Sequence, residues 1–118
     1  MTSFRQLMER ESFTELECFA KKNSNLYVVL GKTGDIITNS SVNESIDNAV
    51  KRVLGEPDVP TLEPIERWLR TDPSRSFCLT LKYESFVIDS NKGDVTVSIT
   101  SPEGDHAYTL ALERIKAL

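Results

Sequence analysis

The sequence predicts an α+β domain of two layers, in which three or four helices flank one antiparallel sheet. The spacing of the apolar residues predicts this class. They recur at helical spacing in several segments before Arg70, a short β-branched run interrupts them at 26–30, and the spacing changes to two from Ser76 onwards. The expected sheet combines an N-terminal hairpin with a C-terminal three-stranded meander, and residues 1–118 are expected to form a single α+β domain.

The chain is expected to begin with helical structure. Apolar residues within 4–8 fit a helical turn behind a Thr2 or Ser3 cap. Ser12-Phe13-Thr14-Glu15 has the form of a second capping box, and apolar residues follow it at helical spacing. We therefore expect one kinked helix or two short helices that end near Lys22.

A hairpin and a further helix are expected next. Leu26–Leu30 is a continuous apolar run typical of a central strand buried on both faces, and 36–39 is the expected returning strand after a tight connection at 31–35. Ser41-Val42-Asn43-Glu44 has the pattern of a capping box, and apolar residues then recur at helical spacing. These signals predict a helix that starts behind this box and ends at Gly55.

The segment Gly55–Pro60 contains two prolines and a glycine, so it is expected to be a loop. Thr61 is the expected cap of another short helix, in which Pro64 is tolerated in the first turn and which Asp72-Pro73 ends. The apolar face of this helix is expected to consist of Leu62, Ile65, Trp68 and Leu69.

The C-terminal part of the chain is expected to form the meander. From Ser76 alternate residues are apolar, and the phase of this alternation flips at Glu84-Ser85, which indicates a bulge or a bend within one strand. Turn-forming residues at 91–94 and 101–105 separate two further strands. The last strand is expected at 107–112.

Composition favours an ordinary cytosolic protein. Hydrophobic residues make up 39% of the chain and charged residues 27%, and neither a signal-peptide core nor a membrane-spanning run is present. The net charge of -4 comes from dispersed acidic residues, which disfavours nucleic acid as the main partner. In a reducing compartment Cys18 and Cys78 are expected to be thiols.

No group of residues specifies a reaction, so an enzyme is not expected and no cofactor or metal is assigned. Gly31-Lys32-Thr33 resembles the end of a phosphate-binding loop, but Leu26 stands where the leading glycine belongs and a strand follows. His106 is the sole histidine, and one histidine cannot supply a multi-histidine metal site.

The densest basic group is the candidate anion-binding site Arg67, Arg70 and Arg75, which lies close to Trp68. An arginine beside an aromatic ring can hold a phosphate, a carboxylate or a base. In the alternative interpretation, Trp68 fills the core and the arginines pair with nearby carboxylates. Those carboxylates are Glu63, Glu66 and Asp72, all within reach on the same helix and its exit.

Sheet edges and faces are the candidate partner-binding surfaces. The strand expected at 107–112 has few charges, so its edge must be covered or paired, and Tyr108, Leu110 and Leu112 are the candidate partner-binding residues. The segment 26–30 and the faces of the meander are open to the same interpretation.

The order of helix, hairpin, helix and three strands resembles the roadblock or profilin-like arrangement. The acidic character is similar to that of secretion chaperones and toxin immunity proteins. These likenesses concern topology and charge, and they imply no functional residues in this chain.

The function expected from the sequence is that of a non-enzymatic, cytosolic protein–protein interaction module of the immunity or inhibitor, adaptor or small-chaperone type. Its partner would be another protein, one with a basic surface among the options, or a second copy joined through a sheet edge. The alternative is a binder of a small anionic ligand or of single-stranded nucleic acid through Arg67, Arg70 and Arg75.

Overall fold

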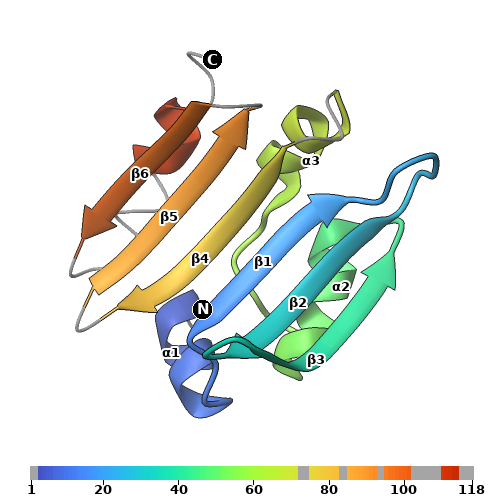
Figure 1. The fold of residues 1–118 in the computed structure, drawn as a ribbon. Coiled ribbons are helices and arrows are strands. Elements are labelled where there is room, and N and C mark those ends of the chain that lie inside the picture. Colours follow the sequence, from blue (N-terminus) through green and yellow to red (C-terminus); the bar gives the residue numbers. More distant parts are fainter. Residues whose placement is uncertain (1–2, 72–74, 83–84, 93–94, 102–109, 115–118) are drawn as a thin grey trace.

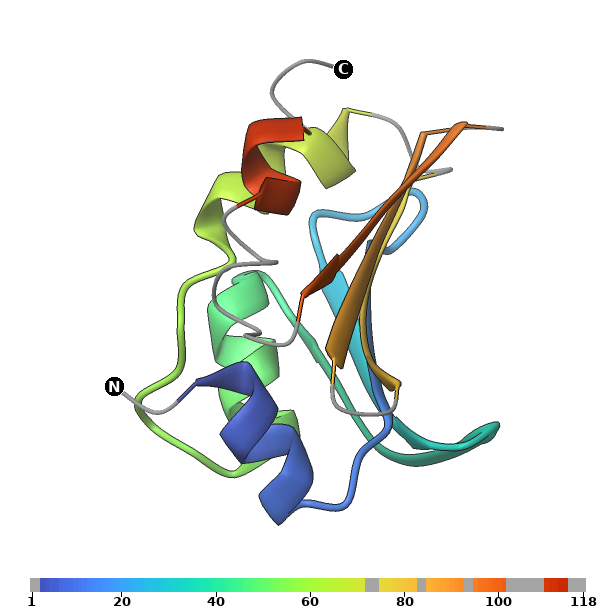
Figure 2. The ribbon, with the colours of Figure 1, turned by 90° about the vertical axis from the view of Figure 1, so that its left-hand side faces the viewer.

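The computed structural model describes residues 3–71, 75–82, 85–92, 95–101 and 110–114, which form a two-layer α+β fold (Figures 1 and 2). The predicted fold class is confirmed. The elements in chain order are α1 (Phe4–Arg10), β1 (Glu15–Ala20), β2 (Tyr27–Thr33), β3 (Ile36–Asn43), α2 (Ile46–Leu54), α3 (Glu63–Arg70), β4 (Ser76–Lys82), β5 (Ser85–Lys92) and β6 (Val95–Ser101). Residues 110–114 are also helical.

The strands form one six-stranded antiparallel sheet in the order β3-β2-β1-β4-β5-β6. Strand β1 pairs with β2 on one side and with β4 on the other, so it joins the N-terminal hairpin to the C-terminal meander. Figure 2 shows the helices on one side of the sheet, and no described element covers the opposite face.

The first helix is confirmed, but the second helix expected to end near Lys22 is wrong. Ser3 caps α1, because its hydroxyl accepts a hydrogen bond from the Gln6 N–H while the Gln6 side chain accepts one from the Ser3 N–H. The chain turns after Arg10 through Ser12, which has a φ of 60°. The following segment is the strand β1, along which burial alternates with the period of two that a strand imposes.

The hairpin of β2 and β3 is confirmed, although β2 is not a central strand. It lies second from the edge of the sheet. Tyr27 and Val29 are buried beneath the helices, whereas Val28 and Leu30 are half-buried on the other face. The expectation that this strand is buried on both faces is therefore wrong, because within the described part of the chain no element covers its second face (Figure 2).

Helix α2 starts four residues later than the capping box predicted, whereas its end is confirmed. Ser45 is the N-cap, and its side chain accepts a hydrogen bond from the Asn48 N–H. The segment Ser41–Asn43 belongs instead to β3, where pairing with β2 outweighs the local capping signal. Gly55 ends the helix in the left-handed conformation, with a φ of 62°.

Helix α3 has the predicted apolar face. The N-cap position belongs to Leu62, one residue beyond Thr61, but the Thr61 hydroxyl still accepts a hydrogen bond from the Glu63 N–H. Pro64 lies in the first turn, as predicted. The four residues expected to face the interior are all buried: Leu62, Ile65, Trp68 and Leu69.

The C-terminal meander contains three strands, but not the three that the sequence predicted. The flip of phase at Glu84-Ser85 separates two strands, β4 and β5, instead of bending one. Residues 110–114 are helical, so the strand expected at 107–112 is wrong for its second half, and 107–109 lie outside the described residues. Ala111 is buried, and the half-buried Leu112 packs against the core, which explains why this helical turn is apolar.

The core lies between the sheet and the helices. Strand β2 passes very close to Phe13 and Val53 at Gly31. A Cβ atom added to Gly31 would lie 2.7 Å from the Phe13 ring and 2.9 Å from Val53 Cγ1. Glycine is therefore required at this position for close packing. The largest fully buried side chains are those of Tyr27, Phe77, Leu7, Met8, Leu16, Ile46, Leu54, Leu62, Ile65, Leu69 and Leu79.

Candidate functional site

The face of the sheet away from the helices, called the open face below, carries apolar side chains that no described element covers. The pairing of the strands determines which residues lie side by side on this face. Phe19 lies opposite Val28 across the β1–β2 pair, and Val28 lies opposite Val42 across the β2–β3 pair. Paired residues point to the same face, so these three form one line across three strands, called the apolar row below.

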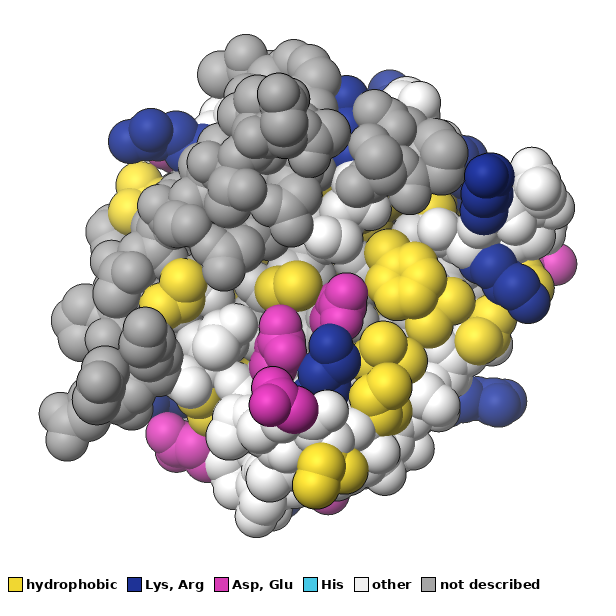
Figure 3. Space-filling model, viewed as in Figure 1, with side chains coloured by type: hydrophobic (Ala, Val, Ile, Leu, Met, Phe, Trp, Pro, Cys, Tyr) yellow, Lys and Arg dark blue, Asp and Glu magenta, His cyan; other side chains and the backbone are white. Residues whose placement is uncertain are grey.

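The next line of the open face lies beside the apolar row. Leu30 of β2 lies opposite Glu17 of β1 and Ser40 of β3. Phe19, Val28 and Leu30 are half-buried and are not members of the core cluster. Figure 3 shows hydrophobic side chains gathered over β1, β2 and β3 on this face, next to a small group of charged side chains.

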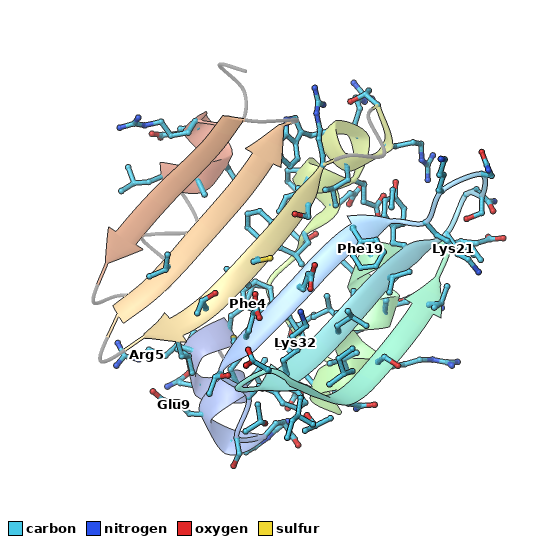
Figure 4. The ribbon with its side chains drawn as sticks, viewed as in Figure 1. Phe4, Arg5, Glu9, Phe19, Lys21 and Lys32 are labelled. Carbon is cyan, nitrogen blue, oxygen red and sulfur yellow. The ribbon has the colours of Figure 1, made fainter. Side chains whose placement is uncertain are left out.

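The charged group consists of Lys32, Glu15 and Glu17. The Lys32 ammonium donates a hydrogen bond to Glu17 Oε2 and lies 3.8 Å from Glu15 Oε2. This hydrogen bond, more than the neighbouring charges, raises the pKa of Lys32 above its ordinary value. Two carboxylates meet one ammonium, so the group leaves one negative charge beside the apolar residues. Figure 4 labels Phe19 and Lys32, which lie toward opposite ends of the β1–β2 pair.

Strand β3 forms one edge of the sheet and is the most exposed apolar element. Among the described residues, all the large hydrophobic side chains classed as exposed lie on it: Ile36 is 69% exposed, Ile37 54% and Val42 46%. The sequence of β3 contains neither a charged residue nor a proline, which are common means of protecting an edge strand from pairing. The edge is therefore open to another strand.

One hydrogen bond to a side chain shows which backbone groups of β3 point to the free edge. The Ser40 N–H donates to the Asn39 side-chain oxygen at 2.9 Å, so this group is not used in pairing with β2. Residues two apart in a strand point their backbone groups the same way, so Val42 also faces the free edge. A register shift opposite Gly31/Lys32 bends the strand at Thr38.

The thiol of Cys78 also lies on the open face, whereas that of Cys18 lies in the core. Cys18 is opposite Phe77 and Cys78 is opposite Glu17, so the two thiols point to opposite faces of the sheet. Both are free cysteines, as expected. Burial raises the pKa of Cys18, and burial together with Glu17 and Glu15 raises that of Cys78 to about 12.

The structure does not bring the three predicted arginines into one site. Arg70 lies over the Tyr27 ring, 5.2 Å from its centroid, whereas Arg75 lies over the Trp68 ring at 5.1 Å. The Arg75 guanidinium also donates to the Trp68 carbonyl at 2.8 Å and to the Thr71 hydroxyl at 2.6 Å. Both bonds come from Nη1 and tie the Arg75 guanidinium to the end of α3.

The alternative interpretation, that Trp68 fills the core and the arginines pair with carboxylates, is confirmed for the burial of Trp68. Within the described part of the chain, Arg67, Arg70 and Arg75 make none of the carboxylate ion pairs. Glu66 instead accepts a hydrogen bond from the Ile46 N–H at 2.8 Å, at the start of α2. Asp72 lies outside the described residues.

Arg67 and Arg70 do share one hollow, of about 360 Å³, but Glu63 and Glu66 line it too. Arg70 also lines a second hollow, of about 200 Å³, at the turn between β1 and β2. The described residues that line the second hollow include Lys21 and Lys22 and no carboxylate. We call Lys21, Lys22 and Arg70 the basic corner; Figure 4 labels Lys21 at this turn.

The predicted partner-binding edge has a different structure. Leu110 and Leu112 are half-buried in a helical turn and do not form a sheet edge, and Tyr108 lies outside the described residues. The residues of the open face were assigned elsewhere from sequence, Phe19 and Val42 to helices and Val28 to a doubly buried strand. For Phe19 the missed signal is the alternation that begins at Glu15, Leu16, Glu17 and Cys18, which has the period of a strand and puts Phe19 on the face of the two glutamates.

Metal and membrane sites receive no support from the described part of the molecule. There, no group of three or more metal-ligating side chains occurs, and no helix is long and apolar enough to cross a membrane. His106 lies outside the described residues. Comparisons with protein-family models, with curated proteins and with solved structures find no match to this chain.

Proposed function

We propose that this chain is a non-enzymatic, cytosolic protein-interaction module that binds a partner protein on the open face of its sheet. The observation that carries the proposal is the apolar row of Phe19, Val28 and Val42, which strand pairing lines up on the face without helices. A two-layer domain needs only one face of its sheet to build a core. Apolar residues on the second face cost solubility and are typical of interaction surfaces.

The chemistry of the open face indicates what a partner must supply. An apolar side chain would pack against Phe19 and Leu30, in the manner of an interface centre. The net negative charge beside them, from Glu15 and Glu17 against Lys32, favours a basic residue at the rim. A surface that binds such a partner would serve an inhibitor, an adaptor or a chaperone equally well, because each of these roles needs only a binding surface and no reactive group.

A photo-crosslinking residue at Phe19 tests this proposal. The full chain with the crosslinker would be exposed to extract of its own cells, and the protein captured in stoichiometric amount would then be purified. We expect Phe19→Asp to weaken the binding of that protein at least about tenfold, since a hot-spot residue contributes more than about 1.4 kcal/mol. The same charge introduced by Asn48→Asp, on the exposed side of α2, is the matched control.

Two results would count against the interaction module. One is the absence of a stoichiometric crosslinked protein. The other is equal loss of binding in Phe19→Asp and Asn48→Asp, because that would show a general effect of charge. Circular dichroism of both variants establishes that each retains its fold.

A second candidate function, the binding of a small anion, is favoured by the basic corner. Lys21, Lys22 and Arg70 surround a hollow whose described lining carries no carboxylate, in a chain with a net charge of -4. This grouping replaces the trio predicted from sequence, because Arg75 is tied to α3. Titration with inorganic phosphate, followed by the backbone amide resonances of 21–25, tests it. Shifts that persist in Arg70→Gln would contradict a role for the guanidinium.

A further inference from the structure

We infer that the β3 edge pairs with β3 of a second copy of this chain, in an antiparallel arrangement with two-fold symmetry. This inference goes beyond the proposed function, because it concerns the edge of the sheet and needs no other protein. The pairing would join two sheets into one continuous sheet, with both open faces on the same side.

The composition of β3 is the first argument for a second copy. Two identical strands repel each other when they carry like charges, but Ile36–Asn43 is uncharged, so the edge is electrostatically neutral toward itself. The exposed apolar side chains Ile36, Ile37 and Val42 belong to this strand. An uncharged apolar edge without proline is the type of edge that pairs with another strand.

The direction of the backbone groups gives the register. Ser40 and Val42 point their N–H and C=O groups to the free edge, as the Asn39–Ser40 hydrogen bond indicates. An antiparallel pair centred on Ser41 places Ser40 of each copy opposite Val42 of the other. On pairing, the Ser40 N–H exchanges the Asn39 side-chain oxygen for the Val42 carbonyl of the second copy, and the Val42 N–H donates to the Ser40 carbonyl. This register avoids the bend at Thr38, and the two Ser41 residues face each other.

The helical layer fits the same arrangement. Helix α2 packs against β2 and β3 alike, so its axis lies over the line between these strands. Across the pair, the two such lines are two strand spacings apart, which is about 10 Å. Packed helices lie about 8–10 Å apart, so the two α2 helices come into contact when the two strands pair.

Charge on α2 is complementary under this symmetry. The two-fold axis makes the two α2 helices run in opposite directions. Glu44, exposed just before the helix, and Arg52, exposed in its last turn, are thereby brought toward each other across the interface. The acidic start of each helix thus faces the basic end of the other, as favourable electrostatics requires.

Sedimentation equilibrium of the full chain, with Ser40→Pro and Ser40→Ala, tests the pairing. Proline removes the outward N–H of Ser40, which an edge strand tolerates, whereas alanine keeps it. We expect the wild-type chain and Ser40→Ala to form dimers and Ser40→Pro to be at least about tenfold weaker in self-association. A monomeric wild-type chain at the highest soluble concentration would overturn the inference, as would equal dimerisation of the two variants.

A disulfide test covers the case in which Ser40→Pro does not fold. In a Cys78→Ser background, Ser41→Cys places two thiols at the two-fold axis, where a non-hydrogen-bonded antiparallel pair has a Cα separation of about 4.5 Å, within disulfide range. We expect Ser41→Cys to form a disulfide dimer on mild oxidation, and Asn25→Cys, exposed at the β1–β2 turn, to remain monomeric. Equal crosslinking of both would contradict the proposed edge.

The two proposals fail separately. Phe19→Asp leaves the β3 edge intact, so this variant should still dimerise while losing the partner of the open face. If the chain is monomeric but binds a protein through Phe19, the edge pairing is wrong and the interaction module stands. If it dimerises through Ser41 but Phe19 captures no protein, the reverse holds.

Discussion

The two faces of the sheet are built by the same strands and yet differ sharply in burial. On β1, Leu16 and Cys18 are fully buried against the helices, whereas Glu17 and Phe19 lie on the open face. On β2, Val29 is fully buried and Leu30 is half-buried. Neighbouring residues therefore differ in whether they contribute to stability or remain available for binding, and the period of two in a strand is the cause.

The largest expected difference between the two faces is in thiol reactivity. Cys78, on the open face, has a pKa raised from 9.0 to about 12, so it should react with a thiol reagent about a thousandfold more slowly than in the unfolded chain. Its rate should rise about tenfold per pH unit up to that pKa. Cys18, in the core, should react only as the chain unfolds, which single-cysteine variants would measure.

The thiol comparison also sharpens the proposed function. Addition of the crosslinked partner should slow Cys78 further, because the partner would cover the open face, and leave the order of the two thiols unchanged. Equal reaction rates for Cys18 and Cys78 at neutral pH would contradict the difference in exposure between the two faces.

The next largest effect is expected from paired truncations of leucine. Leu16→Ala should lower the free energy of unfolding by about 2–5 kcal/mol, because it leaves a cavity in a fully buried site. Leu30→Ala, on the open face, should cost about 1 kcal/mol or less, since water fills the space. Urea denaturation of both variants measures the difference, and similar losses would show that the open face is part of the core.

Close packing between β2 and Phe13 predicts a smaller effect on the covered side. Gly31→Ala should destabilise the chain by about 1–3 kcal/mol, because the new Cβ would lie 2.7 Å from the Phe13 ring. Phe13→Leu in the same chain should recover part of this loss by making room. Strict additivity of the two substitutions in a double-mutant cycle would contradict a direct clash.

The smallest expected effect concerns the charged group of the open face. The pKa of Lys32 is raised by its hydrogen bond to Glu17, so the pair stabilises the fold fully below the ordinary pKa of 10.5 and the contribution is lost as the pH rises through the folded-state pKa. Glu17→Gln should therefore cost about 0.2–1 kcal/mol at neutral pH. To exclude titration of the neighbouring thiol, the pH series would use a Cys78→Ser background, and a constant difference at all pH values would rule out the lysine.

Local signals in the sequence predicted the elements whose structure depends on short-range contacts. The cap of α1 at Ser3, the end of α2 at Gly55 and the apolar face of α3 are examples. The errors fall where distant pairing decides the structure. Glu15–Ala20 has both a capping box before it and a strand-like alternation within it, and pairing with β2 and β4 on both sides selects the strand.

The candidate site was harder to predict than the fold, since it depends on which face of the sheet the helices cover. Val28 was recognised as part of a strand, but its exposure follows from the position of β2 in the sheet and from the placement of the helices. The sequence suggests Trp68 as the aromatic neighbour of Arg70, whereas the structure places Arg70 over the ring of Tyr27, in a distant strand. No local pattern contains that information.

The central position of β1 has a consequence for biosynthesis. Its second neighbour, β4, leaves the ribosome long after β1 does, as the pairing of Glu15 with Thr80 makes plain. Until β4 has been synthesised, one edge of β1 has no partner strand, and the core cannot be completed before β4 pairs with it. Pairing between strands so far apart in the sequence slows folding, and the exposed edge of β1 makes the nascent chain prone to aggregation in the meantime.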